Sequence, residues 1–221
     1  MPAIGPSPEM YLKSLFELSP VDEPVSIAAV AGRLGVTPVS ASEMVHRLER
    51  GHLVVHRRYR GVRLTTGGRR HAVGLIRRHR LWECFLHFEL GLAWEAVHDL
   101  ACELEHAATD EVTEALASRM QHPVRCPHGN PIPDRQQRLQ AETTLPLTDL
   151  ELGDEGVLVS VHPETAGTLA YLAAHDFRPG RGFLVERIEP TDLLYLLRHQ
   201  AGTITVGPEL ASRLNVRRGK P

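Results

Sequence analysis

The first fifty residues alternate apolar and polar positions with the period of a helix, and short breaks divide them into three segments. The pattern predicts helices at residues 9–18, 26–35 and 37–51. Ser26 and Thr37 stand where helix N-caps are expected, and Pro38 occupies a first helical position. Gly35 ends the second helix, and the three- to four-residue turn that follows is typical of a helix-turn-helix motif.

The pattern then changes to a period of two. Residues 53–57 and 61–65 alternate apolar and polar side chains around Tyr59-Arg60-Gly61, which predicts a β-hairpin. A hairpin directly after a helix-turn-helix is the wing of a winged helix, so the N-terminal third is expected to be a winged helix-turn-helix domain.

The rest of the chain divides into a helical part and a β-rich part. Helical spacing predicts helices at residues 65–91 and 93–107, and Thr109 is expected to cap a third helix over residues 110–120. A loop rich in Pro, Gly and Asn follows between Gln121 and Gln140. Strand patterns then occur at residues 156–161, 182–188, 193–199 and 203–207, around one helix at 164–176. The predicted fold class is therefore α+β, with domains at residues 1–70, 71–140 and 143–221.

Composition limits where such a chain can act. No apolar run approaches the ~20 residues of a membrane span, so no membrane partner is expected. Three cysteines are too few for a disulfide framework and favour a reducing cytoplasm. The long amphipathic helices of the middle domain favour a homodimer, because they lack a closed core of their own.

The net charge of −2 conceals a strong asymmetry along the sequence. Residues 47–80 hold eleven arginines and one acid, Glu49, whereas residues 99–155 hold twelve acids and four arginines. A basic block on a winged helix indicates contact with DNA phosphates, although a solvated charged face is the plain alternative.

The helix that begins at Thr37 is the expected recognition helix. Its early residues would face base edges in the major groove of double-stranded DNA, and Glu43 suggests a cytosine contact. The candidate base-facing residues are Thr37, Ser40, Ser42 and Glu43. The candidate phosphate-binding residues are Arg47, Arg50, Arg57, Arg58 and Arg60.

Metal-ligand side chains form stripes on two of the predicted helices. His79 and Glu83 are four residues apart, so both project from one helix face. The next helix carries a second stripe, formed by His98, Cys102, Glu105 and His106. Thiolate, imidazole and carboxylate together favour Fe, Ni, Co or Zn over Mg or Ca. A single His–Glu pair is common on solvated helices, but six such residues indicate a metal site. Cys126 and His128 lack a second pair nearby, which argues against a zinc finger.

Two other functions remain open from the residues alone. A metal-binding enzyme, such as a metallohydrolase, would need a general base outside the ligand set, and the sequence offers none. A metal-independent winged-helix regulator would leave the six residues of the two stripes unexplained. The chain is therefore not expected to be an enzyme.

Several motifs together resemble the diphtheria toxin repressor family of iron- and manganese-dependent regulators. They are EMYL, the helix-turn-helix, LTTGGR, RRHRLWE, VHDLACELEH and HGNPIP, and they run in order over residues 8–134. The C-terminal module resembles the family's SH3-like domain more loosely. The resemblance implies a repressor that binds its operator as a dimer when Fe²⁺ or Mn²⁺ is bound, and that controls metal uptake. Co²⁺, Ni²⁺, Zn²⁺ or Cd²⁺ would substitute in vitro.

The resemblance also implies two metal sites per chain. The primary site would consist of Met10, Cys102, Glu105 and His106, and the ancillary site of His79, Glu83, His98 and Glu164. Gly167 stands where the family has an amide ligand, so a water or His162 would complete the ancillary site. Arg80 and Asn130 match anion-binding positions, but Cys126 replaces the usual hydroxyl there. The soft ligands Met10 and Cys102 favour Fe²⁺.

Overall fold

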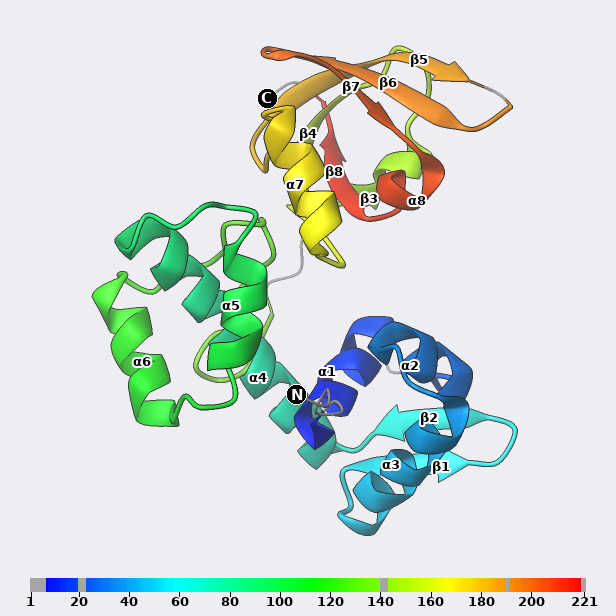
Figure 1. The fold of residues 1–221 in the computed structure, drawn as a ribbon, viewed down its shortest axis with the longest axis vertical. Coiled ribbons are helices and arrows are strands. Elements are labelled where there is room, and N and C mark those ends of the chain that lie inside the picture. Colours follow the sequence, from blue (N-terminus) through cyan, green and yellow to red (C-terminus); the bar gives the residue numbers. More distant parts are fainter. Residues whose placement is uncertain (1–6, 20–22, 140–142, 190, 220–221) are drawn as a thin grey trace, which may run out of the picture. The chain divides into compact units, whose positions relative to one another are not determined.

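The computed structural model describes residues 7–19, 23–139, 143–189 and 191–219 (Figure 1). Its contacts divide the chain into two compact units, one ending at Arg77 with the segment Arg135–Arg138 added, the other holding the remaining residues. The architecture is α+β, as predicted. The domain boundaries at 70 and 140–143 stay predictions, and residues 140–142 lie outside the described part of the chain.

The N-terminal unit is a winged helix-turn-helix. Its elements are α1 (Pro8–Leu18), α2 (Ile27–Leu34), α3 (Pro38–Arg50), β1 (Val54–Arg57), β2 (Gly61–Leu64) and the first part of α4 (Thr66–Cys84). The predicted caps are present: Ser26 Oγ accepts from the Ala29 amide at 3.1 Å, and Thr37 Oγ1 accepts from the Ser40 amide at 3.1 Å. These bonds satisfy amide groups that have no partner within a helix. Buried aliphatic side chains form the core, among them Leu15, Val30, Val45, Leu48 and Val62.

The wing is attached to the chain segment that precedes α2. β1 and β2 pair antiparallel, from Val54 opposite Leu64 to Arg57 opposite Gly61. Val25 and Val62 exchange two backbone hydrogen bonds of 2.9 and 2.8 Å. A Cβ on Gly61 would lie 2.7 Å from the Val25 carbonyl oxygen, and its φ is +99°, so this position requires glycine.

The second unit begins with the C-terminal part of α4. The helix continues into the π-helical turn η1 (Phe85–Glu89) and is followed by α5 (Val97–Leu104) and α6 (Asp110–Arg119). The prediction of one helix over 93–107 is therefore too long at both ends. The chain must turn before Thr109, whose side chain caps α6. The helix therefore ends at Leu104, Glu105 is its C-cap residue, and His106 lies beyond it.

The C-terminal part is an antiparallel sheet of order β3-β8-β4-β5-β6-β7 (Figure 1). Its elements are β3 (Leu145–Pro146), η2 (Leu147–Asp149), β4 (Glu155–Val161), α7 (Ala166–Ala174), β5 (Gly182–Glu189), β6 (Leu194–His199), β7 (Gly202–Val206), α8 (Pro208–Ala211) and β8 (Leu214–Arg218). The four predicted strands and the predicted helix are confirmed. Strands β3 and β8 were not predicted, since β3 is only two residues long and β8 has only two buried positions, Leu214 and Val216.

Trp94 connects the helical part of this unit to the sheet. Its side chain is buried in the apolar core that Phe177, Leu158 and Leu169 also form. Its Nε1 donates to the Pro127 carbonyl at 2.8 Å, and the Arg178 guanidinium lies 5.4 Å from the ring centre. Trp94 therefore belongs to the C-terminal core although it precedes α5 in the sequence.

The loop after α6 lies directly against β4. The Val161 amide donates to the His128 carbonyl at 3.0 Å. Gly129 has φ +84°, and a Cβ there would lie 1.9 Å from the Val159 carbonyl oxygen. No side chain fits at this contact. Every helix among the described residues is too short or too polar to cross a membrane.

Candidate metal centre

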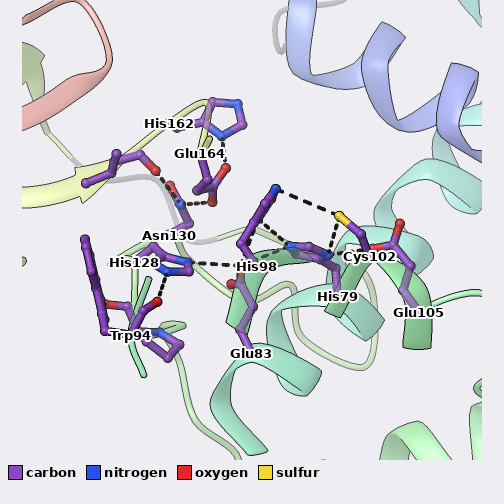
Figure 2. A network of polar contacts seen from close by, with 12 residues as sticks. His79, Glu83, Trp94, His98, Cys102, Glu105, His128, Asn130, His162 and Glu164 are labelled. Atoms are coloured by element: carbon purple, nitrogen blue, oxygen red, sulfur yellow. Dashed lines mark hydrogen bonds and ion pairs between the residues drawn. The ribbon is translucent and has the colours of Figure 1, made fainter. Parts of the chain in front are cut away.

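Polar side chains from α4, α5 and the loop after α6 converge in the second unit (Figure 2). Glu83 is fully buried and His79 is 3% exposed. His79 and Glu83 of the α4 stripe contact His98 and Cys102 of the α5 stripe, as the spacing of the stripes predicted. Such burial is costly for charged groups unless they pair with each other or bind a metal.

Glu83 lies at the centre of this cluster. Its Oε1 is 3.0 Å from His79 Nε2, 3.3 Å from His98 Nδ1 and 3.0 Å from His128 Nδ1. Its Oε2 is buried and accepts no hydrogen bond from any described residue. A buried carboxylate oxygen without a donor, beside three imidazoles, is suited to a cation.

The electrostatics of the cluster follow from this arrangement. Burial alone would raise the pKa of Glu83, but the positive charges and hydrogen bonds of His79 and His128 hold it well below its usual range. Burial opposes the charged form of His98, yet its hydrogen bonds to Cys102 and Glu83 raise its pKa to about 10. Burial opposes the charged form of His128 as well, but the charge and hydrogen bond of Glu83 raise its pKa, so a metal that binds His98 or His128 must displace a proton.

Sequence reasoning missed His128 and Cys126. His128 is fully buried, and its Nε2 donates to the Trp94 carbonyl at 2.9 Å. Because a carbonyl only accepts, the proton is fixed on Nε2, and Nδ1 faces Glu83. Ligand atoms of Glu83, Cys126 and His128 lie within 4.8 Å of one another. The search for a second Cys/His pair in the sequence could not find their partner, because it is a glutamate on α4.

A second group of ligand atoms adjoins the first. His79 Nδ1 lies 2.6 Å from Glu105 Oε2, so the His79 ring has one nitrogen toward each carboxylate. Cys102 Sγ lies 3.9 Å from His79 Nδ1 and 3.8 Å from His98 Nε2. His106 Nε2 is 3.6 Å from Glu105 Oε1 and is partly exposed.

Met10 lies on α1 in the N-terminal unit, where it is half-buried. It belongs to a different unit from Cys102, Glu105 and His106, so its place in the predicted primary site stays a prediction.

Glu164 comes from the segment before α7 and reaches the cluster. Its Oε1 accepts from Asn130 Nδ2 at 2.6 Å, and its Oε2 is 3.2 Å from His162 Nδ1. Burial acts against its charge, but the hydrogen bond and charge of His162 hold the pKa of Glu164 far below its usual range. Ligand atoms of Glu83, His98 and Glu164 lie within 4.8 Å of one another.

The remaining residues predicted around the ancillary site have other contacts. Arg80 Nη1 donates to the Pro131 carbonyl, and Asn130 Nδ2 also donates to the Val161 carbonyl at 2.9 Å. Both predicted anion ligands thus contact protein oxygens. A Cβ on Gly167 would meet no described atom within 4 Å.

The predicted DNA-contacting residues lie on α3 and the wing. Thr37 caps α3, and its Oγ1 is 3.0 Å from Ser40 Oγ. Nearly all of them are exposed, and only Ser42 is half-buried; the exposed ones are Thr37, Ser40, Glu43, Arg47, Arg50, Arg57, Arg58 and Arg60. The Arg58 guanidinium lies 4.9 Å from the centre of the Tyr59 ring. An exposed recognition helix and a cationic wing remain available to a nucleic acid.

A winged helix followed by a buried cluster of imidazole, carboxylate and thiol groups defines the class of metal-responsive DNA-binding regulators. Comparison with known families agrees. The model of the iron-dependent repressor N-terminal DNA-binding domain matches residues 4–62, and that of the iron-dependent repressor metal-binding and dimerisation domain matches residues 65–134. The FeoA domain model matches residues 145–218.

Individual relatives point the same way. The diphtheria toxin repressor of Corynebacterium jeikeium is 37% identical over 132 residues, which cover 60% of this chain and 55% of that protein. The structure of a manganese-dependent transcriptional repressor in complex with manganese has a TM-score of 0.88 at 30% identity, covering 96% of this chain and 100% of that one. The structure of ScaR with bound Zn²⁺ has a TM-score of 0.84 at 29% identity, with coverages of 97% and 100%.

The chain belongs to the family of iron- and manganese-dependent transcriptional repressors that includes the diphtheria toxin repressor. The predicted resemblance is thereby confirmed. The chain spans about half the length of the curated relatives it matches.

Proposed function

We propose that the chain is a transcriptional repressor that binds operator DNA as a homodimer when Fe²⁺ or Mn²⁺ is bound. The observation that carries this proposal is the buried Glu83, which gathers three imidazoles and keeps one oxygen without a donor among the described residues. The same chain presents an exposed, arginine-rich winged helix. Metal sensing and DNA binding are thus both supported by particular residues.

Two donor sets would hold metal. The first is centred on Glu83 and contains His98 and Glu164, with His79, Cys126 and His128 as its other neighbours. The second contains Cys102, Glu105 and His106, with Met10 proposed from the N-terminal unit. The donor atoms of Glu83, His98 and Glu164 lie within 4.8 Å of one another, so they can share one ion at bond lengths of about 2.0–2.3 Å.

The donor chemistry supports transition metals. Thiol and imidazole groups favour Fe²⁺, Co²⁺, Ni²⁺, Zn²⁺ or Cd²⁺ over Mg²⁺ and Ca²⁺, and the soft groups Cys102 and Met10 favour iron over manganese. A bound metal would supply a positive charge that the buried carboxylates need, while the chain's own residues fix where that charge lies.

Metal would act on DNA binding because its proposed ligands come from both the winged domain and the helical region. Met10 lies on a helix of the winged domain, whereas Cys102 lies in the helical region. An ion that both residues bind would favour one arrangement of the two units, and linkage requires that DNA tighten metal binding by the same factor. A dimer would place two recognition helices about 34–36 Å apart, one turn of DNA.

Exposed apolar side chains support the dimer. Phe88 is 62% exposed, Leu90 55% and Val124 61%, and all three belong to the helical region or its loop. Large apolar side chains exposed in one region favour a partner that covers them, and two-fold dimers are the commonest oligomers.

The proposal is tested by metal-dependent DNA binding. Duplexes selected from a random library by the Fe²⁺-loaded chain serve as operator, and binding is followed by fluorescence anisotropy with Fe²⁺, Mn²⁺, Zn²⁺ or a chelator. We expect chelation to weaken binding at least tenfold and Cys102→Ser to do the same at limiting metal. Glu103→Gln, an exposed neighbour on the same helix, is the matched control and should leave metal activation intact.

The same measurements separate the alternatives. Unchanged DNA affinity on chelation would support a metal-independent regulator, and absence of salt-dependent duplex binding in a metal-loaded chain would support a metal-binding enzyme. A repressor acts beside its DNA, which is why the expected cytoplasmic location is part of this proposal.

A further inference from the structure

A second cluster of metal-ligand side chains lies in the N-terminal unit, where the recognition helix meets the wing. His46 and Glu49 are on the last turns of α3, and His56 is on β1. Ligand atoms of these three residues lie within 4.8 Å of one another. None of them belongs to the donor sets centred on Glu83 and Cys102.

One backbone hydrogen bond and two side-chain contacts hold this cluster together. Glu49 Oε1 accepts a hydrogen bond from the His56 amide at 2.9 Å, which anchors the carboxylate to the wing. Its other oxygen, Oε2, lies 3.7 Å from His46 Nδ1. The His46 and His56 rings meet edge to face with centres 5.5 Å apart. The carboxylate and both rings thus converge from two different elements.

A simple surface ion pair explains only part of this arrangement. A His and a Glu three residues apart on a helix often pair weakly in solvent. That pairing accounts for His46 and Glu49, but not for a second imidazole from another element. Glu49 is also the one acid between residues 47 and 80, among eleven arginines. A carboxylate at this place lowers the affinity of a surface for DNA phosphate, unless a cation neutralises it.

We propose that His46, Glu49 and His56 form a third divalent-metal site, which takes Zn²⁺ or a similar borderline ion such as Co²⁺. Two imidazoles and one carboxylate are three of the four ligands that zinc takes, and the partial exposure of the cluster lets water fill the fourth position. Because its ligands come from α3 and β1, an ion there ties the wing to the recognition helix. It also replaces the negative charge of Glu49 by a net positive charge within the arginine-rich segment 47–80.

The test is to count and locate metal in the full chain. Co²⁺ is titrated into wild-type protein and into the double variant His46→Gln/His56→Gln, with equilibrium dialysis for stoichiometry and visible absorption for coordination. We expect the double variant to bind one fewer Co²⁺ per chain. The lost signal should lack a thiolate-to-cobalt charge-transfer band, because this cluster contains no cysteine. His52→Gln together with His71→Gln removes two exposed histidines of the same domain as a matched control.

A measurement on the wild-type protein makes the result independent of how the variant folds. One equivalent of Zn²⁺ beyond saturation of the thiol-containing sites should shift the imidazole ¹⁵N resonances of His46 and His56. Equal Co²⁺ stoichiometry in the double variant and wild type, or ¹⁵N resonances that do not move, would overturn the proposal. A wild-type protein that shows no thiolate-to-cobalt band would instead count against the metal sites at Cys102 and Cys126, and it leaves the count of Co²⁺ ions as the test of the third site.

Discussion

Replacing Gly129 by alanine should detach the loop after α6 from strand β4. Gly129 has a positive φ, and an added Cβ would lie 1.9 Å from the Val159 carbonyl oxygen, a separation that the backbone cannot accommodate. The left-handed backbone costs an L-residue roughly 1–2 kcal/mol, and a stiffer unfolded chain returns about 0.5 kcal/mol.

The forced movement of the loop adds further losses. The hydrogen bond from the Val161 amide to the His128 carbonyl is worth about 1 kcal/mol, and the bond from Asn130 to the Glu164 carboxylate about 1.5–3 kcal/mol. Together these effects predict that Gly129→Ala lowers the free energy of unfolding of this unit by about 4 kcal/mol.

Gly153 offers a matched control because its φ is +85° but a Cβ there would meet no described atom within 4 Å. Gly153→Ala should therefore cost only the backbone strain, about 1 kcal/mol. The assay is urea unfolding followed by tryptophan fluorescence, since Trp94 lies in the C-terminal core. Zn²⁺ affinity should also fall in Gly129→Ala alone, because His128 moves with the loop. Equal destabilisation by the two substitutions would refute the reasoning.

Three further substitutions probe the C-terminal core, its pH dependence and the DNA interface. Trp94→Ala should lower the free energy of unfolding by about 3–5 kcal/mol and speed amide hydrogen exchange in β4, because it removes a ring that the sheet and the helical part share. His199 has both ring nitrogens buried without a partner among the described residues, and burial with the nearby charge of Arg181 lowers its pKa below 6.5. The unfolded chain then binds the proton more readily, so stability should fall as pH drops below about 6.5, and His199→Phe should remove that part of the urea-midpoint change. Arg47→Ala should weaken DNA binding for all sequences and reduce the salt slope by about 1 in anisotropy titrations.

For each of these three predictions, one experimental outcome would contradict it. Unchanged exchange in β4 after Trp94→Ala would show that the tryptophan does not hold the sheet. A pH dependence that survives in His199→Phe but disappears in the exposed control His71→Gln would assign it elsewhere. A loss of affinity confined to one operator sequence after Arg47→Ala would make this residue a base contact.

The sequence predicted those features that depend on neighbouring residues. Ser26 and Thr37 cap their helices as expected because a hydroxyl needs only the amide three residues later. The stripes on α4 and α5 were found for the same reason, since residues four apart share a helix face. The winged helix, the helical region and the β-rich module followed from these local patterns.

The features that the sequence did not predict depend on contacts between segments that are far apart in the chain. Cys126 and His128 belong to the cluster only because their loop lies against β4 and beside Glu83, and spacing in the sequence carries no sign of that. The end of α5 was misplaced because the polar stripe continues through Glu105 and His106, while the chain turns there to reach the Thr109 cap. Helix periodicity does not record where a neighbouring element forces a turn.

The two backbone hydrogen bonds between Val25 and Val62 have a consequence for the thermodynamics of association with DNA. They make the wing part of a continuous structure with the segment before α2, and Gly61 permits this close contact. Fixing a residue's backbone costs about 1–2 kcal/mol of conformational entropy, and folding has already met that cost for the root of the wing. Association with DNA then does not have to order the wing relative to the recognition helix. The entropy still to be lost on binding lies in the long arginine side chains. In the proposed dimer it would lie also in the arrangement of the two protomers, which is the variable that a bound metal would change.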